Sequence, residues 1–483
     1  MRRREAEMTS LAGARTDNGV RRDAAPSARD HLIGCAAALA TLLIAGAVGP
    51  FLGAPARALY VLACASVGWW SWRRGPSAHV GAALLLFLFT PFVRRLVDVR
   101  LGYDASSLML VGPLACLMAP LSQMLGLMTS PGRMRRMEPM LMVIACVVYA
   151  VILTLFKGEW MSAARDAVKW FAPLLYAMLL AETADKDEML AALTNVFVIA
   201  LPLIGVYGVV QYVDPPAWDR YWMQNAPITS IGQPVPYSVR VFSTMNAPAG
   251  FATFTAAGLL LVWFRKSDWL SQIATAPAAL ALFLSLYRTA WISLVVAMLF
   301  CALFRATRGR SFIMMFCVCA ATIVALVATP FGESISARLA TFTEGSRDGS
   351  ARERIDQYSA LWNLSDSSLI GAGFTTVDTG VAGSQPVDGM IIACWQSMGI
   401  VFGLICLFAL VWVAVSAIIG ALSDGGAESV MLGAFGAFFL VQLPLAGIGS
   451  GEAGFLFWTF MALALASVPE RGSRQRLDIG RRR

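Results

Sequence analysis

Apolar runs long enough to cross a bilayer recur along almost the whole chain, and they constrain its fold more than any other feature. Each run holds roughly 17 to 25 residues, the length that a transmembrane helix needs. Hydrophobic residues make up 58% of the 483 residues and charged residues only 14%, whereas about a quarter of a typical soluble chain is charged. The sequence therefore predicts an all-α, polytopic bundle of transmembrane helices.

The runs predict about 12–14 membrane spans. The least well defined are a short run near 79–93 and the two runs, near 270–287 and 289–304, that flank Arg288. A long polar segment over about 332–388 contains charged stretches such as SRDGSARERIDQY, which are typical of short helices with a solvated face. The expected fold is a helix bundle with one long loop that carries short helices.

The distribution of basic residues predicts which side of the membrane each end faces. Residues 1–30 are polar and without apolar periodicity, which indicates a disordered basic tail and not a signal peptide. The transmembrane domain then covers 31–468, and 469–483 form a second basic tail. With both tails in the cytoplasm, the basic loops SWRRG, SPGRMRRMEP, FRKSD and RATRGR also face inward, as the positive-inside rule requires. We expect a multi-pass protein of a bacterial inner membrane, with the loop over about 332–388 in the periplasm.

One basic stretch contradicts this pattern. The segment VRRLVDVRLGYD, residues 93–104, falls on the outer side by the same count. An outward-facing basic segment goes against the topological bias. It is either kept there for function or a sign that one of the early spans is misplaced.

Cysteine and histidine usage points away from metal and disulfide chemistry. All nine cysteines fall inside apolar runs, where they act as small apolar residues, and the chain has only two histidines, His31 and His79. We therefore expect no metal site and no cofactor. The basic N-terminal run is best explained as a topological anchor, so we expect no nucleic-acid partner.

Arg288 is the residue that most needs an explanation. It lies in SLYRTAW, between two apolar runs, and a charged side chain at membrane depth is costly enough that it normally has a purpose. One explanation is an interfacial anchor, whose long side chain reaches the headgroups. The other is an anion site, because a guanidinium group grips phosphate through two parallel hydrogen bonds and keeps its charge.

The predicted outer loops add further arginines to this surface. They carry Arg220, Arg240, Arg338, Arg347, Arg352 and Arg354. An arginine cluster at the outer headgroup level suits a lipid-borne diphosphate and could stabilise it as a leaving group without a metal ion.

Four motifs, in order, resemble the O-antigen ligase and O-antigen or exopolysaccharide polymerase family. The first is RVFSTMNAPAGFA, like the family's Arg, Phe-Ser-Thr and Asn-Pro elements ahead of a membrane helix. LSLYRTAWISL is similar to its Ser-Arg-x-Ala-Trp element. DGSARERIDQYSALWNLSDSSLIGAGF is similar to its loop pattern of Ser, Arg, an aromatic residue and a glycine turn. PVDGMIIACWQSMGIVFGL resembles its Asp-Asn or His-Asn dipeptide before a helix. The resemblance covers about 240–403.

The resemblance implies a metal-independent, inverting glycosyl transfer at the periplasmic face. The donor would be a glycan on undecaprenyl diphosphate, and a hydroxyl of an acceptor sugar would displace the lipid diphosphate. On this interpretation Arg288 holds the donor diphosphate beside Tyr287, and Arg240, Arg352 and Arg354 add to the anion or glycan site. Asp388 stands where many ligases carry histidine and is the second catalytic candidate, either as a base or only as a helix cap.

The departures from the family pattern favour a polymerase. No histidine follows His79, Asp388-Gly389 replaces the His-Asn pair, and Tyr287 replaces the serine before the arginine. The aspartate at position 388, together with VRRLVDVRLGY, resembles exopolysaccharide polymerases more than ligases acting on lipid A core. A ligase remains the first alternative and a lipid-linked glycan transporter without chemistry the second. Membrane lipid, a chain-length regulator and export machinery are the further partners that a polymerase implies.

Overall fold

The computed structural model describes residues 28–53, 55–128, 137–226, 228–266, 268–328, 359, 369–374 and 389–466. Within these ranges the chain is helical, and the one β-type contact is an antiparallel bridge between Gly232 and Val239. The all-α prediction is confirmed. The tails over 1–27 and 467–483 and most of the predicted long loop lie outside the described residues.

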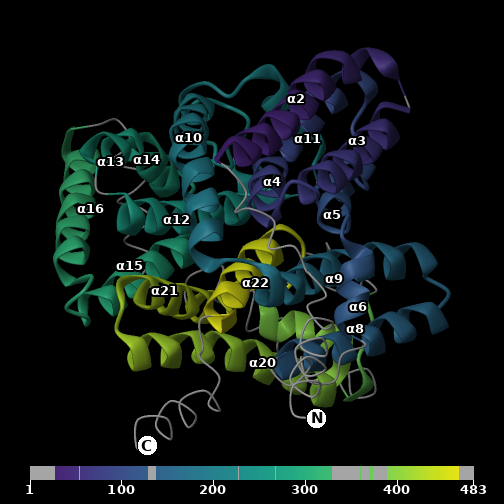
Figure 1. Ribbon diagram of the computed structural model, residues 1–483. Helices are drawn as coiled ribbons and strands as arrows, with labels where there is room; N and C mark the ends of the chain where they lie inside the picture. The colour runs from purple at the N-terminus through teal and green to yellow at the C-terminus, as the bar shows by residue number, and fades with distance from the viewer. Residues whose placement is uncertain are drawn as a thin grey trace, which may run out of the picture.

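The helices follow one another in a single bundle (Figure 1). In chain order they are α2 (Ala28–Leu52), α3 (Pro55–Trp72), α4 (Pro76–Leu101), η1 (Leu108–Val111), α5 (Gly112–Leu117), α6 (Leu121–Met128), α8 (Glu138–Phe156), α9 (Trp160–Thr183), α10 (Lys186–Val213), α11 (Ala217–Asn225), η3 (Thr229–Ile231), α12 (Pro248–Arg265), α13 (Trp269–Ala274), α14 (Ala276–Leu284), α15 (Arg288–Ala302), α16 (Arg308–Ala328), α20 (Met390–Asp424), α21 (Ala427–Gln442) and α22 (Gly451–Ala466).

Six helices of the described chain are long and apolar enough to cross a membrane: α2, α4, α8, α10, α12 and α20. Five shorter apolar helical segments accompany them, among them α15, α21 and α22. The protein is therefore a multi-pass membrane protein. The predicted short run near 79–93 belongs to α4, a helix of 26 residues that continues to Leu101.

Burial separates central helices from peripheral ones. Almost every residue of α12 is buried, and α4 and α22 are also largely enclosed. By contrast, α2, α10 and α20 each expose one apolar face, with Leu43, Leu203 and Leu404 more than half exposed. Exposed leucines in rows of this kind are typical of helices that face lipid tails, so the peripheral helices form the lipid boundary and α12 lies at the centre.

Close backbone approaches fix the helices around the centre. A Cβ atom on Gly205 of α10 would lie 2.2 Å from the backbone nitrogen of Ala278, so only glycine lets α10 approach α14 this closely. In α20 the helix is interrupted at Gly399, whose φ of 74° favours glycine, and the backbone there touches Leu369 to Gly371. This described part of the predicted long loop is thus anchored on α20.

Candidate active site

The site is built around a break between α14 and α15. Helix α14 ends at Leu284, residues 285–287 are not helical, and Arg288 is the first residue of α15. Leu286 has a φ of 54°, and both the Ser285 hydroxyl and the Trp291 indole N–H donate hydrogen bonds to the Leu282 carbonyl, at 2.6 and 3.0 Å. The break is therefore fixed by side-chain hydrogen bonds and is not a frayed helix end.

Helices α14 and α15 run in opposite directions along α12, with the break at the tip. Near the end of α12, Trp263 donates to Thr275 at the start of α14, and Arg310, which follows α15, donates to the Phe264 carbonyl. At the other end, the Val241 N–H, which precedes α12, donates to the Leu284 carbonyl at 3.1 Å. Arg288 thus lies level with the start of α12, at the turn of a helical hairpin.

Arg288 and Arg240 lie on either side of this tip. Arg240 Nη2 donates to the Leu286 carbonyl at 3.2 Å, two residues before Arg288, and both arginine side chains are half-buried. Since helix N-termini carry a partial positive charge, a guanidinium group at the first residue of α15 adds to an electrostatic field that favours anions. The structure therefore brings together Arg240, Tyr287 and Arg288, whereas Arg352, Arg354 and Asp388 lie outside the described residues.

A buried ion pair holds the loop that carries Arg240. Arg95 of α4 and Asp219 of α11 are both fully buried, and Arg95 Nε lies 3.0 Å from Asp219 Oδ1. The two remaining nitrogens of Arg95 donate to the carbonyls of Ser243 and Met245, each at 2.5 Å. The guanidinium group is thus fully used inside the protein, and it fixes the chain between Arg240 and α12.

Gln211 of α10 completes this support. Its amide nitrogen donates to Asp219 at 2.6 Å, and its amide oxygen accepts from the N–H groups of Phe242 and Ser243 at 3.0 and 2.8 Å. Tyr207 donates to the same carboxylate at 2.7 Å. Because Gln211 and Arg95 each contact both Asp219 and the loop backbone, the network stabilises one conformation of the loop.

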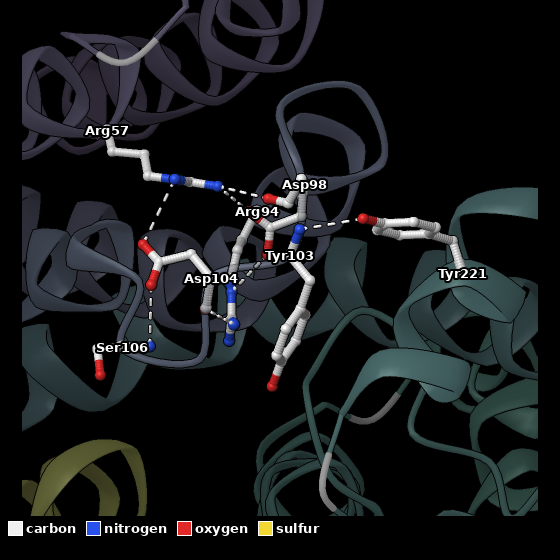
Figure 2. A network of polar contacts seen from close by, with 8 residues as sticks. Arg57, Arg94, Asp98, Tyr103, Asp104, Ser106 and Tyr221 are labelled. Carbon is white, nitrogen blue, oxygen red and sulfur yellow. Dashed lines mark hydrogen bonds and ion pairs between the residues drawn. The ribbon is translucent and has the colours of Figure 1, made fainter.

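The basic stretch over 93–104 has an internal role (Figure 2). Arg94 lies on α4 and contacts Asp98 at 3.0 Å, Arg57 of α3 contacts Asp98 at 2.8 Å and Asp104 at 3.5 Å, and Arg94 also donates to the Asp104 carbonyl. The span predicted near 79–93 is too short, as the second explanation of this stretch required, because Arg94 and Arg95 are buried on α4, a helix that runs longer than the apolar pattern indicated.

A cavity of about 430 Å³ lies next to the hairpin tip. Tyr287 lines it, as do residues from α4, from α12 and from the connection between α21 and α22. Its polar lining residues are Thr90, Lys169, Asn246, Thr253, Tyr287, Gln442, Ser450 and Glu452. Gly250 leaves room for one of them, since a Cβ atom there would lie 2.4 Å from Glu452 Oε1.

The start of α20 borders the same connection. The Met390 N–H donates to the Leu443 carbonyl at 3.0 Å, and a Cβ atom on Gly389 would lie 2.5 Å from the Pro444 carbonyl oxygen. Gly389 follows Asp388 directly. Helix α20 therefore begins close to the wall of the cavity.

Metal ligands do not gather anywhere in the described ranges: no group there combines three or more histidine, cysteine, aspartate or glutamate side chains suited to a metal ion. His79 is fully buried between the Tyr176 hydroxyl and the Cys116 carbonyl, each at 3.0 Å, which is a structural arrangement.

Sequence reasoning missed the supporting residues. Arg95 was visible as a charge next to an apolar run, but its partner Asp219 is more than a hundred positions away and only the fold brings the two together. Gln211 and Gln442, inside or at the end of apolar runs, carried a weaker signal, since each places an amide where an aliphatic side chain is expected.

Comparison with known protein families gives one match. Residues 273–401 match the family model described as O-Antigen ligase, a segment that includes the hairpin tip and the start of α20. The match confirms the resemblance to the O-antigen ligase and polymerase family and supports a membrane glycan ligase or polymerase. No curated protein matches the chain.

Proposed function

We propose, from the O-antigen ligase match over residues 273–401 and the geometry of the hairpin tip, that the protein polymerises lipid-linked glycan repeat units. The donor is an oligosaccharide on undecaprenyl diphosphate, at the periplasmic face of a bacterial inner membrane, with both termini in the cytoplasm. The product is an exopolysaccharide or O-antigen. Its chain-length regulator and export machinery are the protein partners that such a product requires.

One observation carries the proposal. Arg240 donates a hydrogen bond to the carbonyl of Leu286, two residues before Arg288, at a rigid helix break beside a cavity. Two half-buried guanidinium groups at a helix N-terminus suit a diphosphate, because guanidinium offers paired donors and stays charged. Stabilising the diphosphate as it leaves lowers the barrier of the transfer directly.

The proposed reaction is an inverting displacement without a metal. An acceptor hydroxyl oxygen attacks the anomeric carbon of the donor, the new glycosidic bond forms, and the bond from that carbon to the diphosphate oxygen breaks. Arg288 and Arg240 hold the leaving diphosphate, with Arg352 and Arg354 as further contributors from the long loop. Asp388 accepts the proton of the attacking hydroxyl.

A ligase that moves a finished glycan to a lipid A core or another acceptor uses the same chemistry, and the O-antigen ligase match favours it as the second candidate. A transporter would bind the same lipid diphosphate but break no bond. Since the acceptor differs between the enzymes and the leaflet differs for the transporter, the lipid-linked intermediates separate all three.

The test is the lipid-linked glycan pool of a strain that lacks this gene, with the wild-type gene restored on a plasmid as control. Loss of a polymerase should leave single repeat units on the carrier in the outer leaflet. Long polymer on the carrier would indicate a ligase instead. Single units confined to the cytoplasmic leaflet would indicate a transporter and overturn the proposed chemistry.

A further inference from the structure

The cavity beside Tyr287 contains a buried amide without a full set of partners. Gln442, the last residue of α21, is fully buried and lines the cavity. Its Oε1 accepts a hydrogen bond from Thr253 at 3.0 Å, but among the described residues its Nε2 has no partner. Exchanging the two amide atoms would not remove the mismatch, because Thr253 would then accept from Nε2 and leave Oε1 unpaired.

Asn246 provides a second such atom in the same cavity. Its Oδ1 is shielded from solvent and also lacks a partner within the described ranges, and Asn246 lines the same cavity just before α12. A buried polar atom left without a hydrogen bond destabilises the folded protein. A protein retains such groups where something else, typically a ligand, satisfies them.

The donors and acceptors present identify the chemical class of that ligand. One donor at Gln442 and one acceptor at Asn246 match a hydroxyl group, which both accepts and donates. Lys169 and Glu452 place one basic and one acidic side chain in the lining, so the cavity does not select an anion or a cation. A lipid tail would leave both amide atoms unpaired. A neutral, hydroxyl-bearing ring satisfies them.

Size and position agree with a sugar. The volume of about 430 Å³ lies within the range of roughly 300–1,000 Å³ of small-molecule pockets. Small residues widen it, among them Ala249, Gly250 and Gly447, and Tyr287 supplies an aromatic wall. Because Tyr287 directly precedes Arg288, a ring in the cavity lies next to the proposed diphosphate position.

We infer that this cavity is a sugar subsite, in which Gln442 and Asn246 hydrogen-bond the hydroxyl groups of one neutral pyranose ring of the glycan. The inference rests on the proposed function, since it assigns the ring to the lipid-linked substrate or its acceptor. Gln442 and Asn246 act as binding and specificity residues and take no part in proton transfer.

The first experiment measures stability and binding together. The purified protein in detergent is heated with and without methyl glycosides of glucose, galactose, mannose and N-acetylglucosamine. At least one glycoside should raise the unfolding midpoint of the wild type by about 1–2 °C, and Gln442→Met should abolish this shift while unfolding at the same or a higher temperature alone. Asn246→Ala should also abolish the shift.

The exposed Gln123→Met variant makes the same chemical change away from the cavity and should keep the shift. No shift with any of the four glycosides, or an equal shift in Gln442→Met, would overturn the subsite. A loss of polymer in cells of roughly tenfold, at normal protein level, should accompany Gln442→Met. Unchanged polymer would mean that the cavity holds lipid or nothing.

The corresponding sugar 1-phosphates reveal which ring occupies the cavity. A ring of the donor should bind more tightly as the 1-phosphate than as the methyl glycoside, and Arg288→Lys should remove the difference. A ring of the acceptor should bind equally well in both forms, whether or not Arg288 is changed. The thermal shift measures binding and needs no turnover. It therefore tests the sugar subsite independently of whether the protein makes polymer.

Discussion

Arginines occupy two neighbouring regions of this molecule in opposite ways. Arg95 lies in the interior with no exposed surface, and its nitrogens contact Asp219 and two backbone carbonyls. Arg240 and Arg288 lie at the tip of the α14–α15 hairpin, half-buried, next to a cavity. The internal arginine supports the very loop on which Arg240 stands.

This difference in burial separates arginines with a structural role from arginines proposed to bind substrate. A buried guanidinium group must be fully paired by the protein itself, because an uncompensated charge in the interior is costly. A guanidinium group that binds substrate must instead be reachable and held in a fixed direction. Substitution of the internal arginine should therefore reduce stability. Substitutions at the hairpin tip should instead reduce product formation.

The largest expected effect is on stability, at Arg95. Arg95→Ala leaves Asp219 as an unpaired buried carboxylate and frees the carbonyls of Ser243 and Met245, so it should reduce the free energy of unfolding by about 3–5 kcal/mol. The measurement is the thermal unfolding midpoint in detergent, together with protein abundance in the membrane.

Arg74→Ala is the matched control, because Arg74 forms an ion pair with Asp30 at 3.0 Å in which about a third of each side chain stays exposed. Ion pairs that remain in contact with solvent contribute only about 0–1 kcal/mol. If Arg95→Ala were as stable as Arg74→Ala, the buried pair of Arg95 and Asp219 would not stabilise the loop that carries Arg240.

Asp388 should show the largest effect on chemistry. If it accepts the proton of the attacking hydroxyl, Asp388→Asn should reduce polymer formation at least about a hundredfold at normal abundance. Asparagine caps a helix as well as aspartate does but is not a base. A fully active Asp388→Asn variant would leave Asp388 with a capping role only.

Arg240 should have an intermediate effect. Arg240→Lys keeps a positive charge but cannot offer two parallel N–H donors to two phosphate oxygens, so polymer output should fall roughly tenfold. Protein abundance should stay normal, since the loop is held mainly by Arg95 and Gln211. If the protein were lost from the membrane together with its product, Arg240 would have a structural role like that of Arg95.

Metal removal should have the smallest effect. If guanidinium groups alone hold the diphosphate, membranes treated with EDTA should make polymer at an unchanged rate. A rate that collapses and then recovers with magnesium or manganese would assign the leaving group to a metal ion.

The sequence predicts the architecture well, because its signals are local. Apolar runs, basic loops and the SLYRTAW interruption each follow from neighbouring residues, and the hairpin break lies within one residue of Arg288 as expected. The pairing of Arg95 with Asp219, and of Thr253 with Gln442, joins residues more than a hundred positions apart. Only the packing of α4, α11, α12 and α21 determines those contacts, so no local pattern could predict them.

The same limit explains the error at residues 93–104. A charge-based count places arginines in loops, because an unpaired arginine inside the bundle is unfavourable. Asp98 lies one helical turn after Arg94 on the same helix and pairs with it, and Arg57 approaches from α3. Internal neutralisation by Asp98 allows α4 to continue through a segment that its charges alone assign to a loop.

Arg288→Lys tests the central claim most directly, by measuring polymer per unit of membrane protein. The matched control is Arg308→Lys: Arg308 also begins an apolar helix, and its guanidinium group bonds only to the carbonyls of Ala302 and Leu303 among the contacts described. A diphosphate held by paired donors predicts a loss of roughly tenfold to hundredfold in Arg288→Lys at normal abundance, with Arg308→Lys unaffected. Near-normal polymer from an abundant Arg288→Lys protein would contradict the account and leave Arg288 as an interfacial anchor.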